Sequence, residues 1–419
     1  LRDDGILFIS INNAEIHNLI RILNEIFGEE NYVSCLVWNS KYTVSNDKKF
    51  VSDQHEYILA FAKNIEICDF YLLERTEKAN KSYTNPDDDP RGPWKPTPLH
   101  AKSGNKNIVF TFKNGVKWSA PEGRFPRYSK ETLTRLDEEN RLWFGKDGTY
   151  TPNVKSYLSE VKSGITPGTL WKWQDVGHTH EANEELAQIL GKGVFDNPKP
   201  TKLIRRMLQL ATLKDNEDIV LDFFAGSGTT AHAVLAQNEE DGGNRHCISI
   251  QIPEIVENGK FSTIAEICKE RIRLVSKKFE KEGKGNQDRG FKIFKLTQSN
   301  YKIWDKNQEQ NKEELRKQLT LFKNALIDGY KIEDVIYECI IKEGFSLNSK
   351  IDQIKEKKNT IYKIYDNSNY FFLTLDKQIS DNLIDKIDLT KDTMFICLDS
   401  ALDDSKKLSL SLKCMLKTI

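Results

Sequence analysis

The sequence contains few of the features that mark secreted, metal-bound or membrane proteins. It has seven cysteines among 419 residues, an odd number with no C-x-x-C pair. Such spacing is typical of reduced, buried thiols and predicts neither a disulfide framework nor a metal site. The longest apolar runs are far shorter than the ~20 residues that span a bilayer, and no signal peptide opens the chain. We therefore expect a cytoplasmic protein with no metal and no membrane contact.

The sequence also lacks net charge, because 62 lysines and arginines balance 62 aspartates and glutamates. Its hydrophobic share of 38% and aromatic share of 10% are sufficient for globular cores, which excludes wholesale disorder. A small protein stapled by disulfides is excluded by length alone. At ~150 residues per domain, the chain is long enough for two or three domains.

Two parts of the chain have the strand and helix pattern of an α/β layer. In the first 63 residues, apolar strands flank an amphipathic helix, and a similar block lies between residues 197 and 290. The first block is predicted to hold strands over 6–11, 33–38 and 55–62 and a helix that starts at Asn12 with Glu15 and ends at Gly28. The second is predicted to hold helices that start at Thr201, Thr229 and Thr263 and strands over 219–224 and 247–252.

Between these blocks, residues 64–196 lose regular periodicity and gain turns, which predicts an inserted module of short strands and loops. Residues 91–130 carry nine cations and a single acid, Glu122, and five of the seven tryptophans fall in the same module. Tryptophans that fill a small core and lysines that solvate its rim would explain any one of these residues. For the cluster we favour a nucleic-acid surface, because cations bind phosphates and flat rings stack on unpaired bases. The candidate cations are Arg91, Lys95, Lys102, Lys106, Lys113, Lys117, Arg124, Arg127 and Lys130, and the tryptophans are Trp94, Trp118, Trp143, Trp171 and Trp173.

Residues 291–419 form a third predicted unit, rich in lysine, aspartate and isoleucine. Strands are predicted near 291–296, 370–375 and 394–398. No constellation of residues there carries recognisable chemistry, so we expect an interaction or structural domain.

The sharpest local signal is a buried strand that ends in an acid and leads through a glycine turn into a helix, over residues 218–230. Glycines in such a turn let the backbone approach a ligand closely, and the helix start offers free N–H groups. A P-loop is excluded because no lysine follows Gly228. A dinucleotide site stays open, since Gly226, Gly228 and Ala231 fit G-x-G-x-x-A. S-Adenosylmethionine is the third candidate, because its amino-acid end suits Asp222 and it has no pyrophosphate to cradle.

The sequence upstream of the turn makes the interpretation specific. Phe-Asp-Asn-Pro-Lys-Pro-Thr at 195–201 leads into a helix and then into Leu-Asp-Phe-Phe-Ala-Gly-Ser-Gly-Thr-Thr at 221–230. Together these segments resemble the cofactor half of the β-class amino-methylating DNA methyltransferases. Further likeness, to the modification subunit of type III restriction systems and its adenine-specific relatives, covers nearly all of the chain. It lies in Pro-Arg-Gly-Pro-Trp-Lys-Pro at 90–96, Leu-Trp-Phe-Gly at 142–145, Asp-Val-Gly-His at 175–178 and Asp-Gly-Gly-Asn-Arg at 241–245.

The resemblance implies a cofactor loop and a segment that closes over the methionine end of the cofactor. An ammonium at Lys199 and the helix start at Thr201 both favour a carboxylate, which S-adenosylmethionine presents. In such folds the second strand usually ends in an acid that grips the ribose, whereas this chain has Gln251, which can still hydrogen bond. Glu254 is an acid close to this position, so a dinucleotide cofactor stays an alternative. The implied cofactor residues are Lys199, Pro200, Thr201, Asp222, Phe223, Phe224, Ala225, Gly226, Ser227, Gly228, Thr229, Thr230 and Gln251.

One part of the family's pattern is missing. The catalytic signature is Asp-Pro-Pro-Tyr or a close variant, and no such tetrapeptide occurs in the sequence. The family's motif order places it upstream of Leu1, so no catalytic residue is assigned and the chain alone is expected to be inactive. The sheet is expected to lack the strand that would lie between 6–11 and 219–224.

Taken together, these features predict an α/β, Rossmann-like methyltransferase sheet, incomplete at its N-terminal end, with an inserted recognition module and a C-terminal α+β domain. The resemblance implies methyl transfer from S-adenosylmethionine to adenine N6 in double-stranded DNA, with the base flipped. Cytosine N4 is the alternative target, and an NAD-dependent oxidoreductase and a non-catalytic DNA-binding protein are the rival functions. The expected partners are DNA, a second copy of the chain and a restriction subunit with helicase and nuclease functions. The predicted domains are 1–63 for the later strands of the catalytic half, 64–196 for target recognition, 197–290 for the cofactor half and 291–419 for assembly.

Overall fold

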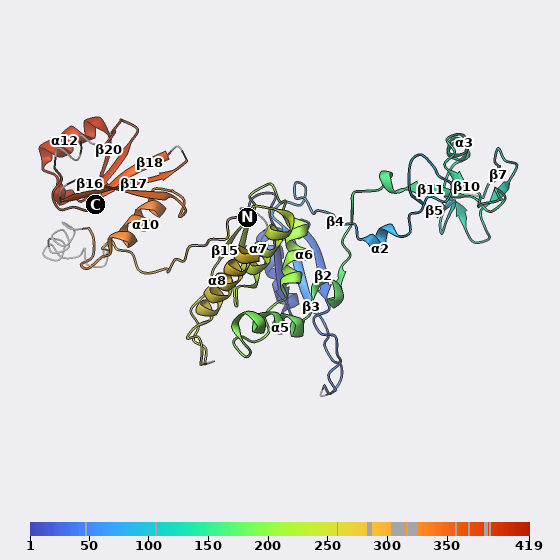
Figure 1. The fold of residues 1–419 in the computed structure, drawn as a ribbon, viewed down its shortest axis with the longest axis horizontal. Coiled ribbons are helices and arrows are strands. Elements are labelled where there is room, and N and C mark those ends of the chain that lie inside the picture. The colour runs from blue at the N-terminus through green and yellow to red at the C-terminus, as the bar shows by residue number, and fades with distance from the viewer. Residues whose placement is uncertain are drawn as a thin grey trace. The chain divides into compact units, whose positions relative to one another are not determined.

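The computed structural model describes the chain except for residues 47, 105–106, 258, 283–286, 303–315, 317–324, 357, 368, 381–383 and 385–386. The chain divides into two compact units, Leu1–Phe291 and Lys292–Ile419 (Figure 1). The second unit begins one residue after the start of the predicted assembly domain. Within the described ranges, no helix combines the length and apolar character needed to cross a membrane.

A four-stranded mixed sheet organises the N-terminal residues, in the order β1, β3, β2 and β13. Strand β3 (Glu56–Ala62) lies inside the sheet and pairs antiparallel with β1 (Ile6–Ile11) and β2 (Tyr32–Trp38). Strand β13 (Leu170–Trp171) pairs in parallel with β2. The three strands predicted in the first 63 residues are confirmed, with ends that differ by at most one residue.

Helix α1 (Ile16–Phe27) begins later than the sequence predicted. Asn12 does not cap it, because the Asn12 side-chain oxygen accepts a hydrogen bond from the Ala14 amide at 3.0 Å in a local turn. The N-cap is Glu15, whose side chain makes no capping bond. The helix ends at Gly28 as predicted, and its apolar face packs on β3.

Residues 170–190 continue this α/β layer, although the sequence placed them in the 64–196 module. After β13, the chain forms the short helix α4 (Trp173–Val176) and then α5 (Thr179–Leu190). Helix α5 packs against α8 (Ile264–Glu282) in a shared apolar cluster. The segment lies with the α/β layer because its apolar side chains are buried there.

A separate two-stranded parallel sheet, β14 (Ile219–Asp222) and β15 (His246–Ser249), carries the second α/β block. Helix α7 (Thr229–Asp241) contacts β15 and lies between α6 (Thr201–Ala211) and α8 (Figure 1). Each predicted strand is therefore present but ends earlier than expected, because residues 223–224 form a turn after β14 and residues 250–254 have no regular structure after β15.

The two faces of this small sheet differ in burial, as alternation along a strand requires. Val220 and Cys247 pack against the cluster that α6 and α7 supply. On the other face, Ile219, Leu221 and Ile248 are 68%, 55% and 49% exposed. Among the described residues no ladder joins β14 to β1, so the two sheets are not continuous.

The strands of residues 64–169 are short, as the sequence predicted, and most surround an apolar core of their own that includes Leu99, Trp118 and Leu133. A three-stranded sheet has the order β10, β11 and β5, and three two-stranded sheets pair β6 with β9, β7 with β8 and β4 with β12. The elements are β4 (Leu73–Glu74), α2 (Glu77–Asn80), β5 (Trp94–Pro98), β6 (His100–Ala101), β7 (Val109–Thr111), β8 (Lys117–Ser119), β9 (Phe125–Pro126), α3 (Lys130–Glu138), β10 (Leu142–Trp143), β11 (Asn153–Tyr157) and β12 (Gly164–Ile165).

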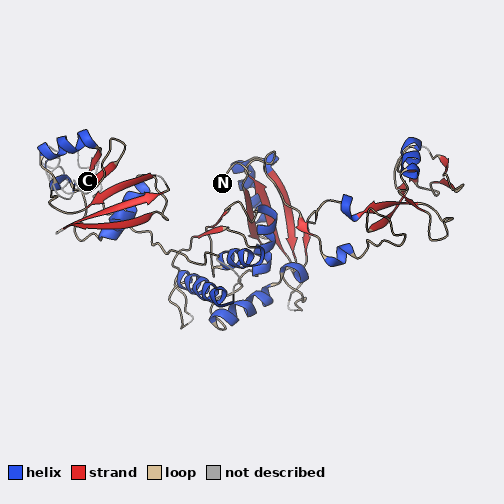
Figure 2. Cartoon of the chain, turned by 45° about the horizontal axis from the view of Figure 1, so that its top comes forward, coloured by secondary structure: helices blue, strands red, loops and turns tan. Residues whose placement is uncertain are grey.

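The C-terminal unit is a five-stranded mixed sheet with a helix on each face (Figure 2). Helix α10 packs on the face that includes Phe371, and α12 packs on the face that includes Phe372. Two predicted strands are confirmed as β18 and β19, but residues 291–296 form no strand. The elements are α10 (Ile332–Lys342), β16 (Lys350–Glu356), β17 (Asn359–Asp366), β18 (Asn369–Thr374), β19 (Met394–Cys397), α12 (Asp404–Lys413) and β20 (Met415–Thr418).

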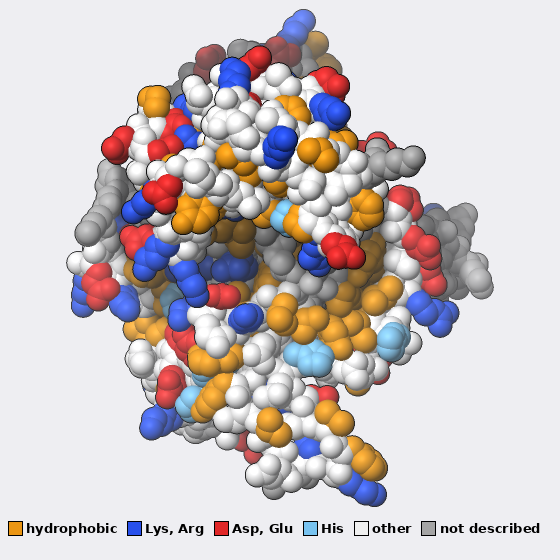
Figure 3. Space-filling model, turned by 90° about the vertical axis from the view of Figure 1, so that its right-hand side faces the viewer, with side chains coloured by type: hydrophobic (Ala, Val, Ile, Leu, Met, Phe, Trp, Pro, Cys, Tyr) orange, Lys and Arg blue, Asp and Glu red, His pale blue; other side chains and the backbone are white. Residues whose placement is uncertain are grey.

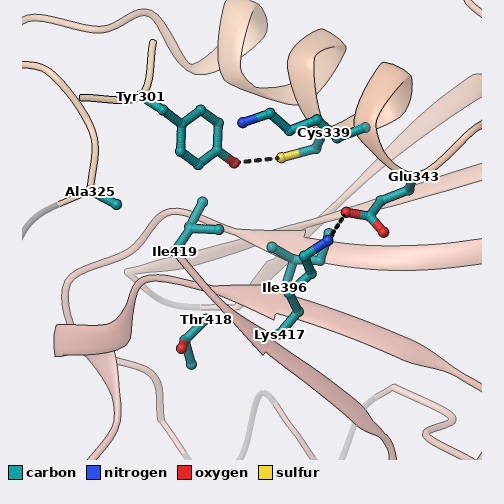
Figure 4. A pocket seen from close by; sticks show the side chains of 9 residues that line it. Tyr301, Ala325, Cys339, Glu343, Ile396, Lys417, Thr418 and Ile419 are labelled. Carbon is teal, nitrogen blue, oxygen red and sulfur yellow. Dashed lines mark hydrogen bonds and ion pairs between the residues drawn. The ribbon is translucent and has the colours of Figure 1, made fainter. Parts of the chain in front are cut away.

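A cavity of about 280 Å³ lies beside α10 in this unit (Figure 4). The Lys342 ammonium lies 3.1 Å from the centroid of the Tyr301 ring, and the Tyr301 hydroxyl is 3.5 Å from Cys339 Sγ. Lys417 pairs with Glu343. Both lysines of the lining therefore have partners within the unit, and the cavity shows no arrangement that selects a ligand.

Candidate functional site

The glycine turn places a fixed acid at the carboxyl end of β14, where α/β sheets bind their ligands. The Asp222 carboxylate accepts hydrogen bonds from the Thr230 hydroxyl at 2.5 Å and from the Phe224 amide at 3.1 Å. Gly226 and Gly228 have positive φ values of 52° and 78°. Glycine adopts this conformation without the penalty that a side chain would bring. The predicted succession of strand, acid, glycine turn and helix is confirmed.

Gly228 is required by packing inside the protein. A Cβ added there would lie 3.1 Å from Cys268 Sγ and 3.2 Å from the Cys268 carbonyl oxygen, both in α8. From the sequence alone, the glycine at 228 is attributed to the close approach of a ligand. In the structure the Gly228 backbone lies against α8, and a side chain at this position would separate the turn from the helix.

Gln251 supports the turn from the residues that follow β15. Its side-chain oxygen accepts a hydrogen bond from the Gly226 amide at 2.7 Å, and its side-chain amide donates to the Ile252 carbonyl at 3.0 Å. One of the turn amides expected to face a ligand is thus already bonded. The proposed contact of Gln251 with a ribose stays a prediction.

Arg271 of α8 is completely buried behind the glycine turn. Its guanidinium donates to the Ser227 and Thr229 hydroxyls at 3.1 and 2.9 Å and lies 3.2 Å from His232 Nδ1. Burial lowers the pKa of Arg271, and the Glu185 carboxylate, 3.5 Å away, opposes that shift. Ser227 and Thr229 are only 2% and 6% exposed. Their side chains therefore face α8 and position the loop.

The same network reaches the segment that precedes α6. Glu185 accepts hydrogen bonds from the Thr201 hydroxyl and from the Thr201 amide, the latter at 3.4 Å. The predicted capping role of Thr201 is wrong, because its hydroxyl is bonded to Glu185 and the N-cap is Pro200. Arg271 and Glu185 thus connect the two segments in which the sequence placed the cofactor. No local motif marks either residue, and the sequence interpretation missed both.

Lys199 lies beside the end of the four-stranded sheet. Its Nζ is 3.0 Å from Glu56 Oε2 and 5.5 Å from the centroid of the Trp38 ring. The Lys199 and Glu56 side chains are 35% and 24% exposed, so a ligand can reach the pair. Glu56 was not predicted as a site residue. The available signal was an acid after His55 at the start of an otherwise apolar strand.

The remaining loop residues differ in exposure. Phe224 is 80% and Phe223 49% exposed, whereas Ala225 is 6% exposed. The two rings lie 5.2 Å apart by their centroids. They offer apolar surface to a flat ring bound near Asp222.

Arg91 has a structural role in place of the predicted contact with DNA. Its guanidinium pairs with Asp89 at 2.9 Å and donates to the carbonyl oxygens of Glu139 and Asn140 at 3.1 Å. Asp89 is buried and also accepts a hydrogen bond from Lys155 at 2.8 Å. The Arg91 guanidinium, with Lys155, holds the pKa of Asp89 far below its usual range. Because every side-chain nitrogen of Arg91 has a partner in the module, we correct its assignment as a phosphate ligand.

The other predicted cations of the module are exposed where the structure describes them, and Lys106 lies outside the described residues. Trp94 and Trp118 are 2% and 5% exposed, so they fill the core and cannot stack on bases. On the face drawn in Figure 3, Lys and Arg side chains are interspersed with Asp and Glu. DNA contact by these cations stays a prediction. The exposed cations are Lys95, Lys102, Lys113, Lys117, Arg124, Arg127 and Lys130.

All seven cysteines are free thiols, as the sequence predicted. Cys268 lies against the glycine turn, and burial raises its pKa to about 11. A thiol with so high a pKa is protonated at neutral pH and is a poor nucleophile. The contact of Cys268 with the turn is therefore a packing contact of a protonated thiol.

Residues 1–275, more than half of the chain, match the model of the DNA methylase family. The chain therefore belongs to this family. It is 37% identical over 304 residues to the type III restriction-modification enzyme StyLTI Mod subunit of Salmonella typhimurium, across 71% of this chain and 46% of that protein. It is 27% identical over 398 residues to the EcoPI Mod subunit of Escherichia phage P1, across 84% and 58%. The chain thus spans about half the length of these relatives.

Among solved structures, the chain is similar to the cytosine-N4-specific PvuII DNA methyltransferase. The two are 14% identical, with a TM-score of 0.30, and the match covers 70% of this chain and 75% of the other.

His232 makes the buried network sensitive to pH. Burial, with Arg271 nearby, lowers the pKa of His232 from 6.5 to about 3. Below the pKa that His232 has in the unfolded chain, the unfolded chain binds a proton at this residue and the folded protein does not. Acid therefore favours unfolding. Between about pH 6 and pH 4 we expect the free energy of unfolding of the first unit to fall by roughly 1.4 kcal/mol per pH unit through this group. Denaturant titrations across this range measure the slope.

His232→Gln should remove this component, because glutamine can accept the Arg271 hydrogen bond without titrating. His17→Gln, at an exposed histidine of α1, is the matched control and should leave the slope unchanged. A slope that is identical in wild type and the His232 variant would contradict the assignment.

Proposed function

We propose that this chain is the cofactor-binding and DNA-recognition part of a methyltransferase that moves a methyl group from S-adenosylmethionine to adenine N6 in DNA. One observation carries the proposal. In a chain of the DNA methylase family, the glycine turn at Asp222 and the segment at Lys199 are connected through the buried Arg271 and the partly exposed Glu185. This connection supports a single site formed by the two segments, which lie on either side of α6 in the sequence.

The residues present fit S-adenosylmethionine. The Asp222 carboxylate has two hydrogen-bond partners and keeps acceptor capacity for an ammonium group. The Lys199 ammonium is the counterpart of a carboxylate, and the exposed rings of Phe223 and Phe224 suit an adenine. The cofactor supplies a methyl group on a sulfonium. The protein's share of the chemistry is to bind and orient it, since positioning alone lowers the barrier to direct transfer.

The glycine turn disfavours a dinucleotide. A dinucleotide needs the amides of such a turn for its pyrophosphate, but the Gly226 amide already donates to the Gln251 side chain. S-Adenosylmethionine has no pyrophosphate and therefore does not need the Gly226 amide, which is already bonded to Gln251.

The target base must leave the duplex, because an amine inside the stack cannot reach the sulfonium. We propose that the amine is held by an Asp-Pro-Pro-Tyr-type segment, which the sequence lacks, on a strand between β1 and β14. Two features support this position. No ladder joins β1 to β14 among the described residues, and Ile219 and Leu221 of β14 are exposed.

We propose that Lys292–Ile419 serves assembly in the cytoplasm, through a second copy of the chain or a restriction subunit with helicase and nuclease functions. Two observations support this role. The segment is a compact unit with its own sheet, and both relatives described above are Mod subunits of restriction-modification enzymes.

Ligand protection tests the cofactor. S-Adenosylmethionine at 100 times its dissociation constant should stabilise the chain by about 2.7 kcal/mol, whereas NAD should not stabilise it. Lys199→Met should weaken binding about tenfold, because it removes a charged partner of the cofactor's carboxylate. Thermal unfolding and calorimetry measure both effects.

Lys202→Met is the control, since Lys202 lies in the first turn of α6, three residues after Lys199, and pairs with Glu181. It should bind the cofactor as wild type does. Protection by NAD, or equal affinity in the two variants, would contradict the proposed site.

The salt dependence of DNA binding tests the recognition module. Replacing Lys102, Lys113 and Lys117 with glutamine should flatten the slope of log K against log salt by up to roughly 0.9 for each phosphate that the protein no longer neutralises. The matched control replaces three exposed lysines of the C-terminal unit, Lys350, Lys355 and Lys377. Fluorescence anisotropy over a salt series gives the slopes. If the first variant keeps the wild-type slope, these lysines do not bind DNA.

Methyl transfer tests the missing acceptor. The chain alone should bind S-adenosylmethionine without labelling DNA, because the acceptors for the target amine are absent. Fusing it to a segment that supplies the Asp-Pro-Pro-Tyr-type signature should restore labelling. Transfer of a radioactive methyl group to DNA by the 419-residue chain alone would show that the acceptors lie within it.

A further inference from the structure

A cavity of about 330 Å³ lies where the chain leaves β2 and where α5 begins. None of the residues that line it is among those assigned to the cofactor. Its walls come from two segments, 40–43 and 178–183, and contain hydroxyl, imidazole, amide and ammonium groups but no carboxylate. The lining residues are Ser40, Lys41, Tyr42, Thr43, His178, Thr179, His180 and Asn183.

Ser40 presents a buried hydroxyl that has no protein partner. The residue is 1% exposed, and its carbonyl oxygen accepts hydrogen bonds from the Thr179 amide at 3.0 Å and hydroxyl at 3.2 Å. Its Oγ has no hydrogen-bond partner among the described residues. An unpaired buried hydroxyl is unfavourable, and a ligand in the cavity that Ser40 lines would supply the missing partner.

The first turn of α5 adds positive potential at the same place. The helix has 12 residues, and its N-terminal end favours anions. His178 Nδ1 accepts the Glu181 amide at 3.1 Å, while the His180 amide has no hydrogen-bond partner within the described residues. Lys41 brings a full charge to the lining.

Two acids near the start of α5 have partners of their own. Glu181 pairs with Lys202, and Glu184 lies 3.3 Å from His180. The cavity therefore combines a free hydroxyl, a helix N-terminus and an ammonium with no unpaired carboxylate in its lining.

We propose that this cavity binds a phosphate group of the DNA backbone, with Ser40 Oγ and the start of α5 as donors and Lys41 as the counter-charge. The binding of a phosphate is inferred from the residues that line the cavity. The assignment of that phosphate to DNA rests on the proposed function. The surroundings of the cavity favour a long ligand such as DNA. The Tyr42 ring at the rim is 52% exposed, and the loop that follows carries the exposed Lys48 and Lys49.

The experiment compares wild type with Ser40→Ala and Lys41→Gln. Lys63→Gln is the matched control, because Lys63 is exposed at the opposite end of β3. Ser40→Ala should leave the melting temperature unchanged or slightly higher, since it removes an unpaired hydroxyl, and should weaken DNA binding about tenfold. Lys41→Gln should lower the salt slope by up to roughly 0.9.

Inorganic phosphate is the second probe. At constant ionic strength it should raise the melting temperature of wild type and of Lys63→Gln, and the rise should be absent in Ser40→Ala.

If phosphate has no effect and Ser40→Ala binds DNA as wild type does, the proposal is overturned. If phosphate protects but DNA affinity is unchanged in Ser40→Ala while affinity for S-adenosylmethionine falls, the anion is the cofactor's carboxylate and the DNA assignment is overturned. If phosphate raises the melting temperature but the protein binds no DNA, the proposed function is overturned and the assignment of a phosphate site is kept.

Discussion

The buried guanidinium of Arg271 is the interaction on which the candidate site depends. A buried arginine is costly unless its charge is paired, and here the two terminal nitrogens of the guanidinium contact Ser227, Thr229, His232 and Glu185. Two of these partners belong to the glycine turn, and Glu185 extends the network to Thr201. The geometry of the turn is therefore set by the packing of α8 as well as by its own glycines.

Hydrogen bonding, more than exposure, distinguishes the surroundings of two predicted anion ligands, Arg91 and Lys199. Their side chains are equally exposed, at 34% and 35%. Each side-chain nitrogen of Arg91 donates to Asp89 or to a carbonyl oxygen, whereas the Lys199 ammonium pairs with a single acid, Glu56. A cation with one acidic partner can exchange it for a ligand more readily than a cation whose nitrogens are all bonded within the protein.

The packing behind the glycine turn is independent of the exposed face of β14 and β15. The turn at Asp222 and the segment at Lys199 depend on α5, α6, α7 and α8, all of which are present. The exposed apolar face of β14 and β15 lies on the opposite side of the same sheet, and parallel sheets are normally covered on both faces. A protein segment that covers this face would complete the layer without changing the network behind the turn.

Local signals in the sequence were enough to predict most of the elements. The strands at 6–11 and 219–224, the helix that ends at Gly28 and the glycine turn follow from apolar spacing and turn residues, which act over a few positions. The tertiary structure decided what those elements contact. Arg271 meets Ser227 across 44 positions and Lys199 meets Glu56 across 143, and no spacing rule marks either pair. The same reason explains why Thr201 is not a cap, why Gly228 rests on Cys268 and why Trp94 fills a core: each outcome depends on a partner that only folding brings near.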